Sequence, residues 1–385
     1  MATDDRDLVT QLDADATAGF HVAARIEADT ELLQQTPSRR AFIGGAAAAV
    51  AAGALLMTSN DALAAGAPAA APNLAATPPA GFTPFAAPGR VIKVGKVDSL
   101  MPNKLYPKED DAKAMLTRAL MELTGKPDLN TAVGQFVHKD DKVCVKVNGI
   151  AEKNMGTNKE LVLPFIDAMI AIGVPPENIT VLEQYGSFLA GTRINAQNVP
   201  KGVKVTVHQN SDATMAERLI PGTGVRTKFV RALTESTCAI NFSLIKDHSI
   251  CGYTGMLKNM THGCQISPHY FHTHHASPQI AMLYAQDVIK SRVRLCITDG
   301  FKIMGHGGPL WKSPQHVVTH EAVYASTDPV AMDTIGWELV EQVRKDKKLR
   351  SLTDEGRPPA YIQAAADLGL GIADRAQIQL KEITI

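Results

Sequence analysis

The sequence predicts an α/β fold with a mainly parallel β-sheet that is covered by helices on both faces. From Val91 onward, short runs rich in β-branched apolar residues alternate with segments of helical periodicity, which is typical of α/β chains. The runs 238–242 and 293–297 are almost continuously apolar, and this pattern indicates strands that are buried on both faces. Because no Gly-x-Gly-x-x-Gly pattern follows the first predicted strand, a standard dinucleotide-binding fold has no support.

The predicted elements follow one another along the chain. Strands are expected where apolar and β-branched residues form short runs, at 91–94, 142–147, 179–183, 203–208, 239–245, 294–298 and 322–326. Helices are expected where apolar residues recur with a helical period, at 111–123, 160–172, 228–235, 278–290, 329–345 and 359–368. The helix at 329–345 is expected to begin with Asp328 as its N-cap and Pro329 at its first position.

Length and cysteine spacing limit the possible classes of protein. At about 150 residues per domain, the 385 residues allow one large domain or two modest ones, with a sizeable core. None of the five cysteines belongs to a Cys-x-x-Cys pair, which argues against a zinc ribbon, a thioredoxin-like dithiol and a ferredoxin-type iron–sulfur cluster. With 45% hydrophobic residues, the chain is also not generally disordered.

Residues 1–64 have the pattern of a twin-arginine export signal. Arg39 and Arg40 precede an Ala/Gly-rich apolar run, and a small-residue cleavage pattern ends at Ala64. The apolar run has about 15 residues, whereas a membrane span needs about 20, and no later stretch is apolar enough to cross a bilayer. We therefore expect transfer by the twin-arginine translocase, cleavage after Ala64 and a periplasmic or other extracytoplasmic location. That location permits disulfides, although five cysteines leave at least one unpaired or bound to something else.

The net charge of zero is an average over two different parts of the chain. Residues 1–64 hold four arginines and nine acidic residues, which leaves 35 basic and 30 acidic residues after them. This small surplus argues against general binding of nucleic acid, while a local basic pocket remains open. Residues 65–89 are rich in Ala and Pro and are expected to form a flexible linker, and residues 90–385 to form a single α/β domain.

Polar residues that directly follow predicted strands are the first candidates for a site, because open parallel sheets bind ligands beyond the carboxyl ends of their strands. Lys146 and Asn148 alternate with buried-type residues at one strand end, so both project to the same face. A lysine there either binds an anion or is a surface residue with an apolar stem. Glu183 ends the next strand, where acidic residues are also common simply because the chain enters solvent.

A later strand end delivers several polar side chains together. Lys246, Asp247 and His248 follow an apolar run, and Lys258 and Asn259 come after a glycine. Two lysines that meet in one pocket favour an anionic group, and each lowers the pKa of the other. The alternative is a buried polar network that only fixes the loops. The residues expected to act in catalysis are Lys246, His248 and Lys258, and those expected to bind the ligand here are Lys146, Asn148, Glu183 and Asn259.

Five of the twelve histidines fall within the fourteen residues from His262 to His275. In a helix His272 and His275 would share a face, and in an extended segment His272 and His274 would do so. Either arrangement offers two imidazoles to a transition metal such as zinc, copper or iron. The alternatives are a solvated polar loop or histidines that hydrogen-bond a substrate. The candidate metal ligands are His269, His272, His274 and His275.

Asp299 and Asp333 complete the set of expected ligand-binding residues. Asp299 leads into the glycine-rich loop 305–309, whose backbone N–H groups could close around an anion. An esterase is not supported, because no Gly-x-Ser-x-Gly elbow occurs in the sequence. Asp333 follows the capping residue Asp328 by about one helical turn and is the better functional candidate of those two.

Taken in order, these residues resemble the domain of unknown function family numbered 362, a bacterial and archaeal group. The resemblance covers about 91–372 and implies an α/β domain with a site at these residues but no settled reaction. Val147 and Asp247 stand where the family usually has Pro and Thr. Some relatives carry a ferredoxin-like cluster domain, and this sequence has no cysteine run for one. The landmarks are Lys146-Val147-Asn148, Glu183, Lys246-Asp247-His248, Leu257-Lys258-Asn259, Asp299-Gly300, Gly308-Pro309, Asp328 to Asp333 and Leu368 to Gly371.

The sequence therefore predicts an exported enzyme, or an enzyme-like cofactor protein, that binds an anionic small molecule together with a transition metal. In this reading the lysines hold carboxylate or phosphate oxygens, and His248 or a loop histidine acts as acid–base group or ligand. The export route favours redox chemistry over simple hydrolysis. The competing hypothesis is a non-catalytic periplasmic protein that binds a ligand or a metal. Substrate, metal identity, oligomeric state and disulfide pairing are not specified by the sequence.

Overall fold

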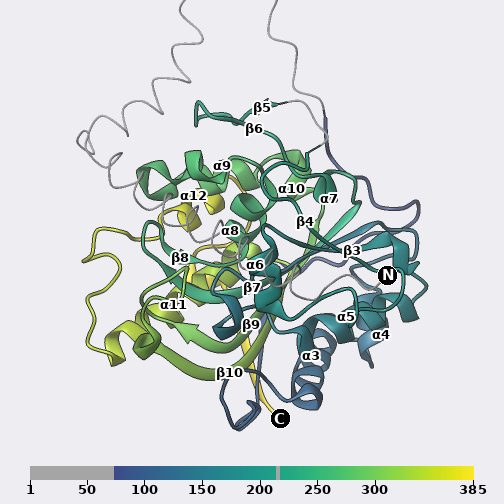
Figure 1. Cartoon of the computed structure of the whole chain (residues 1–385), viewed down its shortest axis with the longest axis horizontal. Helices are drawn as coiled ribbons and strands as arrows, with labels where there is room; N and C mark the ends of the chain where they lie inside the picture. Colours follow the sequence, from purple (N-terminus) through teal and green to yellow (C-terminus); the bar gives the residue numbers. More distant parts are fainter. Residues whose placement is uncertain (1–72, 214–216) are drawn as a thin grey trace, which may run out of the picture.

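The computed structural model describes residues 73–213 and 217–385, so the export signal predicted at 1–64 lies outside the described residues. At the centre is a nine-stranded sheet in the order β11, β1, β10, β9, β7, β2, β3, β4, with β8 paired to the end of β7 (Figure 1). Five of its eight strand pairs are parallel, and the antiparallel pairs along the main path both involve β10. The predicted α/β fold with a mainly parallel sheet is confirmed.

The elements have the following bounds in the described residues. The strands of the large sheet are β1 (Arg90–Gly95), β2 (Val143–Lys146), β3 (Ile179–Glu183), β4 (Lys204–Val207), β7 (Cys238–His248), β8 (Gly252–Thr254), β9 (Val293–Met304), β10 (Val317–Ser326) and β11 (Gln379–Thr384), and the small sheet consists of β5 (Arg218–Leu219) and β6 (Arg226–Thr227). The α-helices are α3 (Glu109–Thr124), α4 (Leu129–Val133), α5 (Lys159–Ala171), α6 (Gly186–Thr192), α7 (Arg231–Thr234), α8 (Met256–Thr261), α9 (Gln279–Tyr284), α10 (Asp287–Lys290), α11 (Pro329–Asp346) and α12 (Tyr361–Asp367). The 3₁₀ helices are η2 (Glu152–Asn154), η3 (Pro176–Asn178), η4 (His262–Cys264), η5 (Pro268–Ala276), η6 (Pro314–His316) and η7 (Arg375–Gln377).

The helices form two layers, one on each face of the sheet. Along β2, Val143 and Val145 pack into one hydrophobic core, whereas Cys144 between them packs into the other, because successive side chains of a strand point to opposite faces. The first core lies against α3, α4 and α5, and the second against α8, α9, α11 and α12 (Figure 1). Burial on both faces is the reason that the central strands are almost continuously apolar.

Most predicted strands and helices are present, with ends shifted by a few residues. The predicted helix 278–290 is instead two short helices, α9 and α10, because Gln286 between them has an extended backbone. The predicted helix 228–235 is helical only over Arg231–Thr234. The elements α4, α6, β5, β6, β8, α8 and β11 were not predicted, and α6, β8 and α8 contribute residues to the candidate site described below.

A flexible linker was expected at 65–89; residues 65–72 lie outside the described residues, and residues 73–89 contact the domain. The backbone N–H of Leu74 donates to the Asp287 carboxylate at 2.8 Å. The ring of Phe85 meets that of Phe136 edge-on, with the centroids 5.8 Å apart. The segment is therefore held in place, because its backbone and its aromatic side chains find partners in the folded domain.

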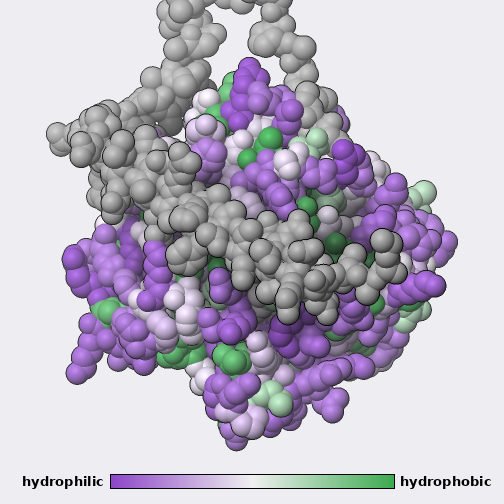
Figure 2. All heavy atoms as spheres, in the orientation of Figure 1, coloured by the Kyte–Doolittle hydropathy of each residue, from purple (hydrophilic) through white to green (hydrophobic). Residues whose placement is uncertain are grey.

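The domain has a mostly hydrophilic surface in the view of Figure 2, and its cysteines are buried. In the view of Figure 2, the described residues present a mostly hydrophilic surface with hydrophobic residues in small separate groups. No helix within 73–213 or 217–385 is long and apolar enough to cross a membrane. The cysteines are all buried and carry free thiols, namely Cys144, Cys238, Cys251, Cys264 and Cys296.

Candidate functional site

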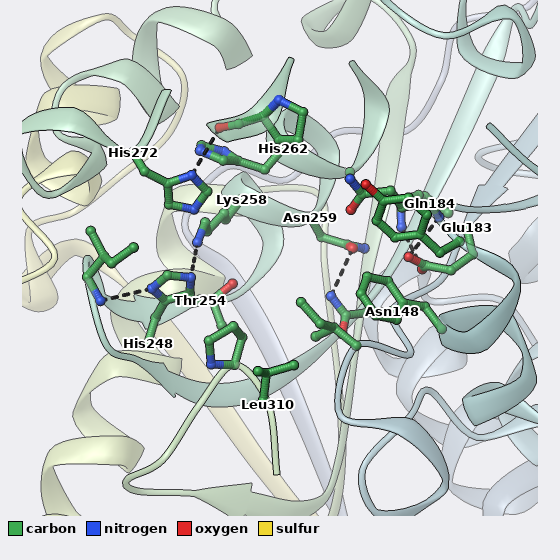
Figure 3. A pocket seen from close by; sticks show the side chains of 18 of the residues that line it. Asn148, Glu183, Gln184, His248, Thr254, Lys258, Asn259, His262, His272 and Leu310 are labelled. Carbon is green, nitrogen blue, oxygen red and sulfur yellow. Dashed lines mark hydrogen bonds and ion pairs between the residues drawn. The ribbon is translucent and has the colours of Figure 1, made fainter. Parts of the chain in front are cut away.

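The strand-end polar residues meet around a cavity of about 110 Å³. It lies beyond the carboxyl ends of β2, β3 and β7, where open parallel sheets bind their ligands. Figure 3 shows two polar groups in it, one formed by Asn148, Asn259 and Glu183 and the other by His248, Lys258 and His272. The lining residues are Lys146, Asn148, Ile150, Glu183, Gln184, Tyr185, Phe188, His248, Ser249, Ile250, Thr254, Lys258, Asn259, His262, Gly263, Pro268, His272, Pro309 and Leu310.

A buried ion pair forms one end of the cavity. The Nζ of Lys146 lies 2.8 Å from Oε2 of Glu183, and the two side chains are 1% and 4% exposed. They meet because β2 and β3 are parallel neighbours whose last residues emerge at the same edge. Lys146 also donates to the carbonyl of Val147. Gly263 leaves the space for this lysine, because a Cβ at that position would lie 2.6 Å from the Lys146 Cε.

A chain of amide hydrogen bonds fixes the side chain of Asn148. The Nδ2 of Asn259 donates to Oδ1 of Asn241 at 2.8 Å and to the carbonyl of Phe242 at 3.0 Å. Its Oδ1 is therefore the atom that accepts from Nδ2 of Asn148, at 3.3 Å. The Oδ1 of Asn148 then accepts from Nζ of Lys246 at 2.7 Å. Each amide has one orientation that satisfies its partners, so Asn148 presents a defined edge to the cavity.

Lys246 lies behind the cavity wall, where it holds Asn148, and does not itself line the cavity. Burial lowers its pKa to about 7, the negative charge of Glu183 opposes this shift, and the neighbouring lysines 258 and 146 add to it. The structure therefore places Lys246, which was expected to be catalytic, where it orients a residue of the site.

His248 and Lys258 form the other polar group of the cavity through a hydrogen bond between Nε2 and Nζ. Burial lowers the pKa of Lys258 to about 8. Burial, followed by the nearby Lys258 charge, holds the pKa of His248 well below its usual value. The imidazole is therefore neutral near pH 7, and the amine is close enough to neutrality to take part in proton transfer.

Two further buried histidines extend this group. The ring of His272 stacks on His248 with the centroids 5.6 Å apart and meets the ring of His262 edge-on at 4.6 Å. The Nδ1 of His272 contacts the carbonyl of Pro268 at 3.0 Å, and the Nε2 of His262 contacts the carbonyl of Phe271 at 3.3 Å. A carbonyl only accepts, so these ring nitrogens carry the protons and Nε2 of His272 keeps a lone pair. Burial lowers the pKa of both histidines.

The remaining wall of the cavity is largely apolar. Ile150 and Leu310 line it, together with Phe188, whose ring stands nearly perpendicular to that of Tyr185 at 5.1 Å. The hydroxyl of Tyr185 accepts from Nδ2 of Asn210 at 2.7 Å, and burial raises the pKa of this phenol. A ligand would thus meet charged groups on one side and hydrocarbon on another.

The expected ligand-binding residues Asp299 and Asp333 lie away from the cavity and hold other parts of the chain. Asp333 accepts from the backbone N–H groups of Met256 at 2.6 Å and Leu257 at 3.0 Å, so it caps helix α8. Asp299 accepts from the backbone and the side chain of Asn158 at 2.7 and 2.9 Å, at the start of α5. Asp328 caps α11 as predicted, accepting from the backbone N–H groups of its first turn.

The four histidines expected to bind a metal do not converge. His272 is buried in the cavity, whereas His269, His274 and His275 are exposed. Neither a helix nor an extended strand continues here, because His274 and His275 have φ angles of 53° and 56° in the left-handed region. Within the described residues, no group of three or more His, Cys, Asp or Glu side chains is placed to hold a metal ion. This corrects the expected ligand set.

The glycine-rich loop 305–309 serves an internal carboxylate, although an anion cradle was predicted. The backbone N–H of Gly308 donates to Oδ1 of Asp247 at 2.6 Å. A Cβ at Gly308 would lie 2.1 Å from the carbonyl oxygen of Asp247, so this close approach requires glycine. Pro309, the next residue, lines the cavity.

Several residues of the cavity had not been singled out from the sequence. His262 belongs to the histidine cluster but is not among the predicted metal ligands, and Tyr185 follows Glu183 by two residues without any role predicted for it. Phe188 and Leu310 had no signal beyond hydrophobicity, because apolar residues of a cavity wall cannot be told from core residues in a single sequence. The strand-end rule found the charged residues because their position depends on sheet topology alone.

The family model of a domain of unknown function, DUF362, matches residues 143–338. The chain belongs to this family. In this DUF362 protein the matched segment contains every lining residue of the cavity. No curated protein matches the chain. Among solved structures, the lactate racemase apoprotein from Thermoanaerobacterium thermosaccharolyticum is similar, with 11% sequence identity and a TM-score of 0.33 over 66% of this chain and 57% of the racemase chain. The DUF362 protein thus matches little more than half of the length of that racemase.

Proposed function

We propose that this protein is an enzyme that binds a small anionic molecule in the cavity and acts on it by acid–base chemistry. The observation that carries the proposal is the balance of charge. Lys146 and Glu183, which both line the cavity, balance each other's charge, and Lys246 directly behind the wall adds positive charge when it is protonated. A carboxylate or phosphate ligand would supply the missing negative charge in a largely buried setting.

The arrangement also supports catalysis in addition to binding. Lys258 and the histidines 248 and 272 place amine and imidazole nitrogens side by side, with pKa values lowered by burial toward or below neutrality. Groups of this kind exchange protons with a bound molecule near pH 7. This favours acid–base and nucleophilic chemistry, and the proposal needs no transition metal from the histidine loop.

Ligand-dependent stabilisation tests the binding part. The protein is heated with glycolate, acetate and inorganic phosphate in turn, and an anion at a hundred times its Kd should stabilise the fold by about 2.7 kcal/mol. Lys146→Met and Lys246→Met should remove most of this shift. Lys290→Met, at an exposed lysine of α10, is the matched control and should retain it. A shift that persists in both cavity variants would show that the anion binds elsewhere.

Turnover decides between an enzyme and a binding protein. The anion that stabilises the protein, together with its aldehyde and ketone analogues, is incubated with it and followed by proton NMR. Chemical change or exchange of carbon-bound hydrogen with solvent deuterium, lost in His272→Gln, supports the enzyme. Stabilisation without either would favour the alternative of a non-catalytic binding protein.

We also propose that the chain is exported by the twin-arginine translocase to an extracytoplasmic location. The support is the sequence pattern at Arg39 and Arg40 followed by the apolar run and Ala64. In a host with this translocase, Arg39→Lys combined with Arg40→Lys should keep the full-length protein in the cytoplasm. Processing of that variant after Ala64, at the rate of the unaltered chain, would contradict the proposal.

A further inference from the structure

The hydrogen bonds of His248 determine which of its nitrogens carries the proton. Its Nδ1 lies 3.1 Å from the backbone nitrogen of Ile250 and 3.4 Å from that of Cys251, and both of these groups are donors. The Nδ1 must therefore accept, and a neutral imidazole then carries its hydrogen on Nε2. Turning the ring over would direct a C–H group at the same two donors, so the observed orientation is the one that satisfies them.

The partner of that Nε2–H group is the Nζ of Lys258. An ammonium group has three donors and no lone pair, so it cannot accept a hydrogen bond. The contact is satisfied only when Lys258 is a neutral amine. The side chain of Cys251 also hydrogen-bonds Lys258, and thus shares in fixing the position of the amine. Lys258 is 6% exposed, and the part that remains open lines the cavity.

From this geometry we propose that Lys258 is a nucleophile that forms an imine with a small aldehyde or ketone carrying an anionic group. The proposal rests on the function proposed above, because Asn148 at the other end of the cavity (Figure 3) and Lys146, which pairs with Glu183 there, would hold the anionic group. It deepens that function by naming the substrate class and the atom that attacks. A neutral amine in a buried pocket is the form of lysine that adds to a carbonyl carbon.

The residues around Lys258 supply the proton transfers that imine formation needs. The Nζ attacks the carbonyl carbon, and the carbonyl electron pair moves onto the oxygen. A proton then leaves the nitrogen and another reaches the oxygen, which gives a carbinolamine. Loss of the hydroxyl group as water, after protonation, forms the C=N bond. The sum is amine plus carbonyl giving imine plus water, without any oxidant or reductant.

His272 is placed to carry these protons. Its Nδ1 donates to the carbonyl of Pro268, so its Nε2 has a free lone pair that accepts a proton from the nitrogen and returns it to the departing hydroxyl. Its ring stacks on that of His248, whose Nε2–H group lies beside the amine and can donate to the carbonyl oxygen once the lone pair of Lys258 has reacted. His272 thus acts as acid and base, and His248 as the donor that keeps the amine neutral.

Reductive trapping tests the proposal. The full chain is incubated with glyoxylate above the Lys258 pKa of about 8, reduced with sodium borohydride, and analysed as intact protein and as peptides by mass spectrometry. We expect one adduct that adds the mass of glyoxylic acid less one oxygen atom, located at Lys258 and formed at least tenfold faster than at Lys290. Lys258→Met should abolish it, and Lys290→Met should not.

Peptide mapping of the unaltered protein keeps the test decisive if Lys258→Met fails to fold. Trapping at Lys258 no faster than at Lys290, or at Cys251 in place of Lys258, would overturn the imine. Glycolate, which has the same anionic group but no carbonyl, separates the two proposals. If glycolate stabilises the protein and no adduct forms, the imine fails and anion binding stands. If acetaldehyde reacts with Lys258 as fast as glyoxylate and glycolate has no effect, the amine is reactive and the proposed anionic ligand is wrong.

Discussion

The ammonium of Lys146 lies 2.8 Å from the carboxylate of Glu183, at the adjoining ends of two parallel strands, in a part of the molecule almost closed to solvent. Charges buried to this extent cost free energy unless each is paired, and here each is the partner of the other. The pair therefore has two roles that experiments can separate. It contributes to the stability of the fold, and it sets how much positive charge a ligand meets.

Removing one partner of this pair should destabilise the protein far more than removing both. We expect Lys146→Met and Glu183→Gln each to lower the free energy of unfolding by about 3–5 kcal/mol, because each leaves a buried unpaired charge. The double variant should lose much less than the sum. Urea unfolding measures all three. The exposed pair Arg231 and Asp212 is the control, and Arg231→Met should cost less than about 1 kcal/mol. Additive effects at Lys146 and Glu183 would contradict the prediction.

Gly263→Ala should weaken anion binding and leave the fold intact. A methyl group there would lie 2.6 Å from the Lys146 Cε, so the lysine must move away from its place in the cavity. The expected result is a tenfold or greater rise in Kd for the stabilising anion, with at most about 1–3 kcal/mol lost in stability. Gly134→Ala is the control, because the nearest atom would be 3.5 Å away. Equal affinities in the two variants would mean that Lys146 does not bind the ligand.

The carboxyl group of Asp333 should make the protein lose stability as the pH rises. Burial raises its pKa from 3.8 to about 7, against the effect of the backbone N–H groups of Leu257 and Met256. Between these pH values the folded protein binds a proton that the unfolded chain does not. The free energy of unfolding therefore falls as the pH increases from about 4 to about 7 and is constant above. Asp333→Asn should remove this slope, whatever its effect on absolute stability. If the free energy of unfolding depends on pH in the same way in the unaltered protein and in Asp333→Asn, the raised pKa of Asp333 is wrong.

The segment 73–89 should contribute measurably to stability, in contrast to a linker. Phe85→Ala removes the edge-on contact with Phe136 and is expected to lower the free energy of unfolding by about 1–3 kcal/mol. Thr83→Ala, at an exposed position of the same segment, is the control and should change it by less than about 0.5 kcal/mol. Denaturant titration of both variants provides the comparison. If the two variants unfold at indistinguishable denaturant midpoints, the segment does not contribute to stability and behaves as a linker.

The sequence was sufficient to predict which charged residues come together. Lys146, Glu183 and His248 end three strands of one sheet, and parallel strands present their carboxyl ends at a common edge. The local pattern of each strand therefore predicts that these three residues lie close together, although they are far apart in the sequence. The same reasoning could not separate Lys246 from Lys258. One side chain holds Asn148 behind the wall and the other lines the cavity, and the difference arises from the turn through β8 and α8, which carried no clear sequence pattern.

Other parts of the site depend on contacts between elements that are remote in the sequence. Asp333 caps a helix that begins 77 residues earlier, and nothing in its own surroundings in the chain indicates that partner. The course of the histidine loop depends on left-handed backbone conformations at His274 and His275, which residues other than glycine adopt infrequently. Helical or extended periodicity therefore could not show which histidine turns inward.

The five cysteines are all buried and carry free thiols, so their reaction with a thiol reagent reports how often the native structure opens. A thiol reagent reaches a fully enclosed sulfur only when the surrounding structure separates, so the labelling rate at each cysteine measures how often that region opens. Cys251 and Cys264 lie beside the cavity loops, whereas Cys238 and Cys296 lie in central strands. A ligand that closes the cavity should slow labelling at the first two before it affects the others. The order in which the cysteines become protected from the reagent would show which regions the ligand stabilises, without any introduced label.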